Sequence, residues 1–185
     1  MEPTPRSDDQ GITVPMVALS LSLSTPPHHH DHDSPDHAGH DWTADLPRTD
    51  HARFFRTADC ARSRLGPVSS WTPTLRLFAG FVLADARAAC LWWASGEHLV
   101  AIYNAAYAPL AAQVHHSLMG STFKESYPDL WPAISQYFDK ARSTGAGVSY
   151  SSAAPLLVER KGWREEAFFS GSFTPVGPPH HPDGF

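Results

Sequence analysis

Aromatic side chains cluster in the later part of this sequence, whereas proline repeatedly interrupts its beginning. Six prolines occur within the first 35 residues, and Phe54-Phe55 is the only aromatic cluster before Ser70. A polar, proline-rich segment buries too little apolar surface to offset the entropy lost on ordering. We therefore expect residues 1–50 to form a disordered His/Pro/Asp-rich tail, residues 51–84 a helical lead-in and residues 85–185 the folded domain.

A histidine run stands out within the expected tail. Imidazole and carboxylate groups are metal ligands, but a stable site needs a fold that fixes them, and this segment offers none. A solvated tail is therefore the favoured interpretation, and a metal-responsive protein is the alternative. The candidate ligands for that alternative are His28, His29, His30 and His32.

The pattern of apolar residues after Ser70 predicts a mixture of helices and strands. A helix is expected over 73–83, with Pro73 at its first position, and another over 131–143, ended by glycines. A shorter helix is expected over 104–112. Short apolar or alternating runs predict strands at 88–93, 99–103, 148–151 and 154–159, with another after a turn at 160–163. Strands separated by a helical block are typical of an α+β fold with an antiparallel sheet and helices on one face.

Several phrases along the chain together resemble one family. These are Leu65-Gly66-Pro67 with Trp71-Thr72-Pro73-Thr74-Leu75-Arg76, then residues 99–107 (LVAIYNAAY), 118–123 (LMGSTF), 127–131 (YPDLW), 157–166 (LVERKGWREE) and 169–176 (FSGSFTPV). In this order they resemble PAS sensor domains near the N-termini of bacterial and fungal hybrid histidine kinases. The resemblance extends from Leu65 to Val176.

The resemblance implies a five-stranded antiparallel sheet with helices packed on one face, and a sensor or dimerisation module that regulates a kinase. The last strand of the family normally follows a Gly-Gly-Val-Phe-like phrase, and this sequence stops at Gly184-Phe185. We therefore expect a C-terminally truncated PAS-like domain without a kinase core. Because a missing strand leaves its neighbour unpaired, we also expect pairing with another chain, or dimerisation through the N-terminal helix.

PAS folds hold ligands between the sheet and the helices, so the resemblance suggests a set of cavity residues. The alternative is that these side chains pack against one another as an ordinary core, because aromatic residues bury large areas without a cofactor. The candidates are Leu91, Trp93, Ile102, Tyr103, Tyr107, Leu110, Phe123, Ile134, Phe138 and Phe169.

Neither flavin nor haem is expected as a cofactor. Flavin-binding light sensors of this superfamily carry an Asn-Cys-Arg-Phe phrase that this sequence lacks, and Cys90 lies in a predicted buried strand, where a thiol is inert. His115-His116 are predicted to lie in a polar loop rather than on a haem-binding helix. Asn104 is expected to cap the following helix. The charged residues 159–166 are expected to form a solvated hairpin.

Composition and motifs restrict the remaining functions. A net charge of −5 argues against nucleic-acid binding. No run approaches the roughly 20 apolar residues that span a bilayer. Two cysteines make no disulfide framework, which favours a reducing, cytoplasmic location. Hydrolase, zinc-protease and P-loop motifs are missing, so no enzyme activity is predicted.

We expect a non-catalytic sensory or interaction module of two-component phosphorelay. Its expected partners are a histidine kinase, another PAS domain or a second copy of the chain. Binding of an apolar or aromatic small molecule in the cavity is the alternative function.

Overall fold

The computed structural model describes residues 41–185 except 59, 153–154, 161 and 179–181. Most of the expected tail, including the four candidate metal-ligating histidines, lies outside the described residues. The boundary expected at residue 50 is too late, because a 3-10 helix η2 (Trp42–Asp45) precedes it. The ring of Trp42 packs 5.8 Å from that of Trp71, so this segment belongs to the core.

Short helices form the first layer of the fold. They are α1 (Asp50–Thr57), η3 (Cys60–Arg62), η4 (Val68–Ser70) and α2 (Pro73–Ala84). The Thr72 side chain accepts a hydrogen bond from the Leu75 amide, and Pro73 occupies the first turn of α2. These local signals confirm the helix predicted over 73–83.

A tight hairpin follows the first layer. Its strands are β1 (Cys90–Ser95) and β2 (His98–Tyr103), with Gly96 at a φ of 61° in the turn between them. The register pairs Cys90 with Tyr103 and Trp93 with Val100. Because successive side chains of a strand point to opposite faces, this register decides which residues face which helices.

Helices connect this hairpin to the later strands. They are α3 (Ala108–Ala111), η5 (Ala112–Val114), α4 (Phe123–Ser126) and α5 (Trp131–Thr144). Gly145 ends α5 in the left-handed conformation, which confirms the predicted helix over 131–143 and its glycine stop. The helix predicted over 104–112 is wrong in extent, because residues 104–107 form a turn held by the Asn104 side chain.

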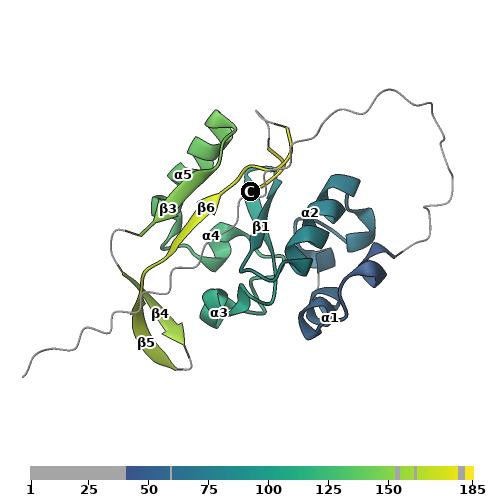
Figure 1. Cartoon of the computed structure of the whole chain (residues 1–185), viewed down its shortest axis with the longest axis horizontal. Helices are drawn as coiled ribbons and strands as arrows, with labels where there is room; N and C mark the ends of the chain where they lie inside the picture. The colour runs from purple at the N-terminus through teal and green to yellow at the C-terminus, as the bar shows by residue number, and fades with distance from the viewer. Residues whose placement is uncertain (1–40, 59, 153–154, 161, 179–181) are drawn as a thin grey trace, which may run out of the picture.

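The later strands are β3 (Val148–Ser151), β4 (Leu156–Arg160), β5 (Trp163–Ala167) and β6 (Ser170–Phe173). Strand β3 pairs with β6 and β4 with β5, both antiparallel. The β4–β5 hairpin lies at the far end of the molecule from α2 (Figure 1). The predicted α+β class is therefore confirmed, while the strands form separate two-stranded ladders.

Residues 183–185 lie along the free edge of β1. The Trp92 amide donates to the Phe185 carbonyl at 2.8 Å, and the Phe185 amide donates to the Trp92 carbonyl at 3.0 Å. The Ala94 amide donates to the Asp183 carbonyl at 2.7 Å. The unpaired neighbour expected from a missing strand is therefore not observed at Trp92 and Ala94, because the chain itself fills these positions.

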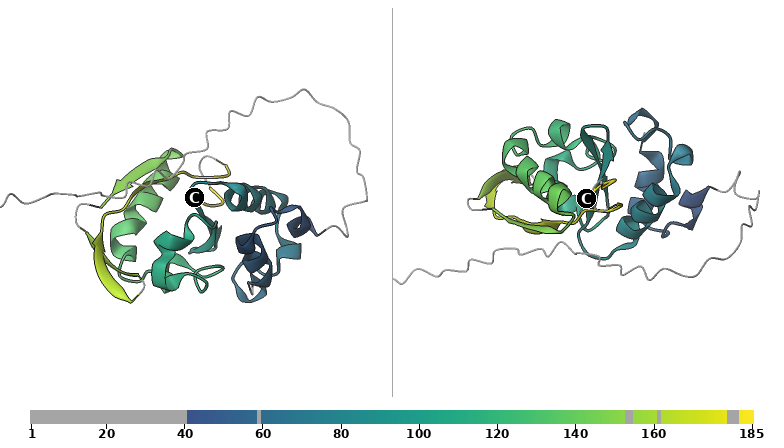
Figure 2. Two further views of the ribbon diagram at one scale, coloured as in Figure 1. Left: turned by 60° about the horizontal axis from the view of Figure 1, so that its bottom comes forward. Right: turned by 90° about the horizontal axis from the view of Figure 1, so that it is seen from above.

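Helices cover both faces of the β1–β2 hairpin rather than one. Figure 2 shows the blue N-terminal helices on one side and α5 with the later strands on the other. The rings of Phe78 in α2 and Trp93 are 6.5 Å apart, whereas Phe123 in α4 lies 4.7 Å from Trp92. None of the described helices is long and apolar enough to cross a membrane.

Gly184 allows the C-terminal residues to approach β1, and this closeness gives a test of the fold. A Cβ atom added at Gly184 would lie 2.8 Å from the Trp92 carbonyl oxygen. We expect Gly184→Ala to lower the free energy of unfolding by about 1–3 kcal/mol, because backbone must shift. Urea unfolding followed by tryptophan fluorescence measures this change.

Gly80 in α2 provides the matched control. A Cβ atom there meets nothing within 4 Å, so Gly80→Ala should raise stability by about 0.5–1 kcal/mol through helix propensity. Equal effects of the two substitutions would contradict the pairing of residues 183–185 with β1.

Candidate functional site

An aromatic cluster fills the space between the Trp92 face of the hairpin and helices α4 and α5. Phe123 contacts Trp92, and its ring also lies 5.6 Å from that of Phe138 in α5. Phe138 packs 4.4 Å from Phe173 of β6 and 5.0 Å from Phe185. The cluster thus joins the hairpin, α5, β6 and the C-terminal residues in one packed core.

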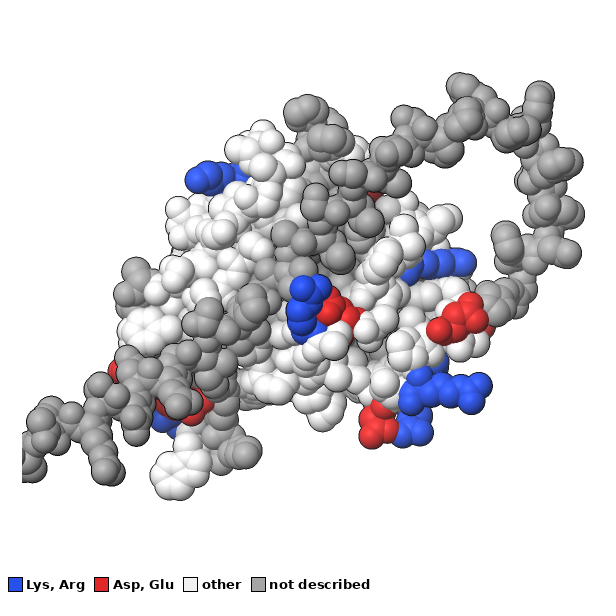
Figure 3. All heavy atoms as spheres, viewed as in Figure 1, with Lys and Arg blue, Asp and Glu red and all other residues white. Residues whose placement is uncertain are grey.

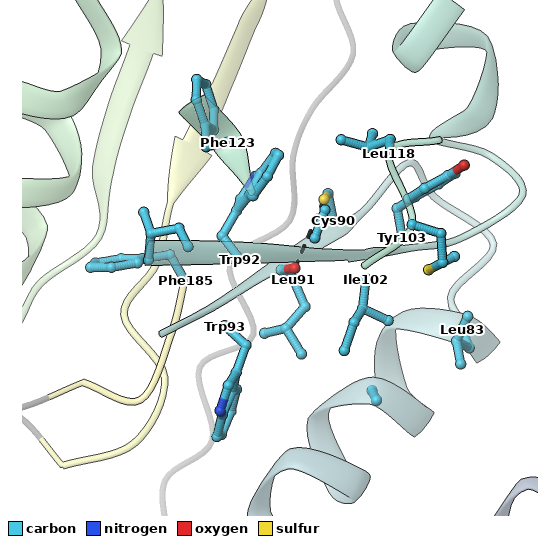
Figure 4. Close-up of a cluster of buried hydrophobic side chains, with 14 of the residues drawn as sticks. Leu83, Cys90, Leu91, Trp92, Trp93, Ile102, Tyr103, Leu118, Phe123 and Phe185 are labelled. Carbon is cyan, nitrogen blue, oxygen red and sulfur yellow. Dashed lines mark hydrogen bonds between the residues drawn. The ribbon is translucent and has the colours of Figure 1, made fainter. Parts of the chain in front are cut away.

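The ten predicted cavity residues do not share one space. Figure 4 shows Leu91, Trp93 and Ile102 on the opposite face of the hairpin from Trp92 and Phe123, on the side of α2. Strand alternation explains the difference, since Leu91 is paired with Ile102 while Cys90 is paired with Tyr103. These three residues therefore pack on the α2 side of the hairpin and cannot line a cavity next to α5.

The other seven candidates differ in burial. Tyr103, Phe123, Ile134 and Phe138 are buried members of the core. Tyr107 is partly buried, with its ring 5.8 Å from that of Tyr103. Leu110 and Phe169 are half-buried.

Sequence reasoning missed Trp92, Tyr127, Trp131, Phe173 and Phe185, which the structure adds to the α5 side. Only Trp92 had a usable signal. Trp92 and Trp93 are adjacent in one strand, and neighbouring side chains of a strand point to opposite faces. The two tryptophans must therefore pack on opposite faces of the hairpin.

Ionisable groups in this interior are held in their neutral forms. Burial raises the pKa of the Cys90 thiol well above its ordinary value. Burial likewise raises the pKa values of Tyr107 and Tyr127. A protonated, buried thiol is a poor nucleophile, so Cys90 acts as a small apolar side chain.

Asn104 ties three segments together and is the most completely bonded polar side chain of the core. Its Nδ2 donates to the carbonyls of Asp85 at 2.9 Å and Arg87 at 2.6 Å. Its Oδ1 accepts from the amides of Ala89 at 3.2 Å and Tyr107 at 2.9 Å. The predicted helix cap is therefore wrong, because α3 begins at Ala108 with Tyr107 as its N-cap residue and has no side-chain cap. The Asn104 side chain instead holds the turn of residues 104–107 and anchors the loop before β1.

A polar hollow of about 490 Å³ lies between η3 and the start of α4. Residues from η3, the turn after it and the start of α4 line it. Its hydroxyl groups are already engaged: Ser63 donates to the Cys60 carbonyl, Ser121 to the Ser117 carbonyl, and the Thr122 oxygen accepts from the Glu125 amide. The hollow contains none of the ten predicted cavity residues.

Neither the charges on one face nor the metal-ligating side chains of the described residues form a concentrated site. On the face seen in Figure 3, basic and acidic side chains are scattered among uncharged ones. No three His, Cys, Asp or Glu side chains among the described residues gather closely enough to hold a metal ion. His115 and His116 lie on the loop after η5, as expected, and their rings stack 4.0 Å apart.

Comparison with protein-family models, with curated proteins and with solved structures finds no significant match to this chain. The PAS resemblance therefore stays a prediction based on the residues that carry it.

Truncation of Phe138 tests whether the aromatic cluster is the central packing unit. Phe138 is 1% exposed, so Phe138→Ala should cost about 3–5 kcal/mol of unfolding free energy by leaving a cavity. Phe168 is 55% exposed, and Phe168→Ala should change stability by no more than about 0.5 kcal/mol. Similar losses for both variants in chemical denaturation would contradict this assignment.

Removing the Asn104 side chain tests how much its buried hydrogen bonds contribute to stability. Asn104→Ala leaves buried backbone donors and acceptors unpaired, and we expect it to cost about 2–4 kcal/mol. Gln136→Ala removes an amide whose bond to the Ala133 carbonyl is exposed, so thermal unfolding should barely shift. If Asn104→Ala leaves the free energy of unfolding unchanged, solvent replaces these hydrogen bonds and the prediction is wrong.

Proposed function

We propose that this chain is a non-catalytic, PAS-like sensory or interaction module of two-component phosphorelay signalling. The observation that carries the proposal is the order in which antiparallel segments follow one another in space. Together with the family resemblance of residues 65–176, this order favours a signalling module over the other functions considered.

Five antiparallel segments can be followed across the molecule. Strand β2 pairs with β1, and β1 pairs with residues 183–185. Asp183 and Gly184 then bond to Val176, which follows β6, and β6 pairs with β3. Helices α3, α4 and α5 lie between β2 and β3 in the chain. This arrangement supports the five-stranded sheet with an intervening helical block that the resemblance implies.

The buried polar side chains support a non-catalytic role. In the described part of the chain they are Thr43, Asn104 and Thr122. Thr43 bonds to the Asp41 carboxylate, and the other two bond to backbone amides. Groups committed to local structure in this way leave little freedom for proton transfer or nucleophilic attack.

Exposed apolar side chains support a role in protein contacts. Trp163 on β5 is 79% exposed, and Leu77 on α2 is 56% exposed. Tryptophan is enriched among the residues that contribute most to binding at protein interfaces. These side chains lie on separate elements, and both elements would be available to a kinase that carries or binds the module.

A fusion experiment tests the proposal. The full chain is placed upstream of a histidine kinase core that lacks its own sensor, and autophosphorylation is followed with labelled ATP. We expect the fused chain to change the rate severalfold, because a folded sensor biases the kinase, and Phe138→Ala to abolish that change.

The matched control is Phe168→Ala, which should keep the effect of the fused chain because its side chain is largely exposed. The proposal is contradicted if the wild-type chain and both variants leave the kinase at the rate of the isolated core while circular dichroism shows the wild-type chain folded.

A further inference from the structure

Three histidines from distant parts of the chain converge on Tyr103 at the end of β2. The His51 Nε2 atom of α1 lies 2.7 Å from the Tyr103 carbonyl oxygen. The Tyr103 hydroxyl lies 2.8 Å from His115 Nδ1 and accepts a 3.2 Å hydrogen bond from the His116 amide. The rings of His51 and His115 are 6.3 Å apart and nearly parallel.

The partners of these atoms determine where the protons lie. A carbonyl oxygen only accepts, so His51 Nε2 must carry a hydrogen. The Tyr103 oxygen accepts from the His116 amide, which directs its own proton to His115 Nδ1. When a neutral His115 accepts this proton at Nδ1, its own hydrogen lies on Nε2.

The loop that carries His115 is held in a strained conformation. Ala112 has a φ of 50° and a ψ of −122°, and His116 has a φ of 66°. Left-handed conformations of this kind cost non-glycine residues of order 1–3 kcal/mol and persist only where surrounding contacts hold them. The Tyr103 hydroxyl is one such contact, because it binds both His115 and the backbone of His116.

We propose that the Tyr103–His115 hydrogen bond is a proton-sensitive latch that holds the loop of residues 112–117 against α1 in neutral solution and releases it in acid. Protonation of His115 places an N–H group at Nδ1, facing an oxygen that already accepts from His116. The Tyr103 hydroxyl proton then loses its acceptor, which weakens the contact that holds the strained loop.

The released loop also changes its contacts with α1. Phe54 packs edge-on against both imidazoles, with ring centres 5.7 Å from His115 and 5.2 Å from His116. Phe55 is fully buried, with its ring 5.9 Å from that of Trp71. Acid should therefore loosen the loop and the Phe54 side of α1 without unfolding the chain.

The titratable groups around His115 determine the sign of the pH effect. His116 faces it on the same loop, His51 on α1 and Tyr103 on β2, with Cys90 and Tyr107 behind Tyr103. Burial, followed by His116 and His51, lowers the pKa of His115. Burial raises the pKa of Tyr103 to about 12, so its hydroxyl stays protonated.

A lowered histidine pKa means that the open form takes up the proton more readily than the latched form. The latch is therefore most stable above the ordinary histidine pKa of about 6.5, and it weakens as the pH falls from there through the lowered value.

The test is an NMR titration of the full chain between pH 5 and 8. We expect the His115 ring to titrate below ordinary histidine. We also expect the His116 amide signal to move with that titration, and the cross-peak between the Phe54 and His116 rings to be lost at the acidic end. A His115 ring that titrates at or above the ordinary value, or a His116 amide signal that does not follow it, overturns the proposal.

Two variants separate the latch from general acid sensitivity. His115→Gln keeps an acceptor that does not titrate, so the Phe54–His116 cross-peak should persist to the acidic end. Tyr103→Phe removes the hydroxyl, so the Phe54–His116 cross-peak should be lost even at pH 8, whereas Tyr150→Phe should behave as wild type. Loss of the Phe54–His116 cross-peak in acid in His115→Gln overturns the proposal even if Tyr103→Phe does not fold. None of these results depends on the proposed signalling function.

Discussion

Strand β1 has hydrogen-bonded neighbours on both edges and packed helices on both faces. Strand β2 lies along one edge and residues 183–185 along the other. Trp92 packs toward α4 on one face, and Trp93 packs toward α2 on the other. Burial of a tryptophan side chain removes about 150–250 Å² from water. The two adjacent side chains therefore hold two layers of helices to one strand.

A second constraint is that the backbone around this strand needs internal partners. Asn104 supplies four hydrogen bonds at the point where the chain enters β1 and leaves β2. The neighbouring Tyr103 bonds through its carbonyl to α1 and through its hydroxyl to the loop after η5. Apolar packing and polar pairing thus meet at the same end of the hairpin.

The sequence predicted much of the fold because several elements carry strong local signals. Helix α2 begins with Thr72 and Pro73, and α5 ends at Gly145, so both could be placed closely from sequence. The candidate site was predicted less well. Leu91, Trp93 and Ile102 share the apolar character of the α5-facing residues, and composition alone does not say which face of a strand a residue occupies.

His51 illustrates why long-range contacts escaped prediction. It lies in an amphipathic helix 52 residues before Tyr103, and nothing in its neighbourhood indicates that its ring reaches the end of β2. The positive φ angle of Ala112 escaped prediction for the same reason, since alanine does not indicate a left-handed conformation.

By itself the sequence determined the α+β class, the main helices, the β1–β2 hairpin and the buried character of Cys90, because caps, periodicity and apolar runs act over a few residues. Tertiary structure alone decided which tryptophan faces α5, that residues 183–185 complete the edge of β1, and that three histidines meet at Tyr103. These features depend on register and on contacts between distant segments, where a shift of one residue exchanges the two faces of a strand.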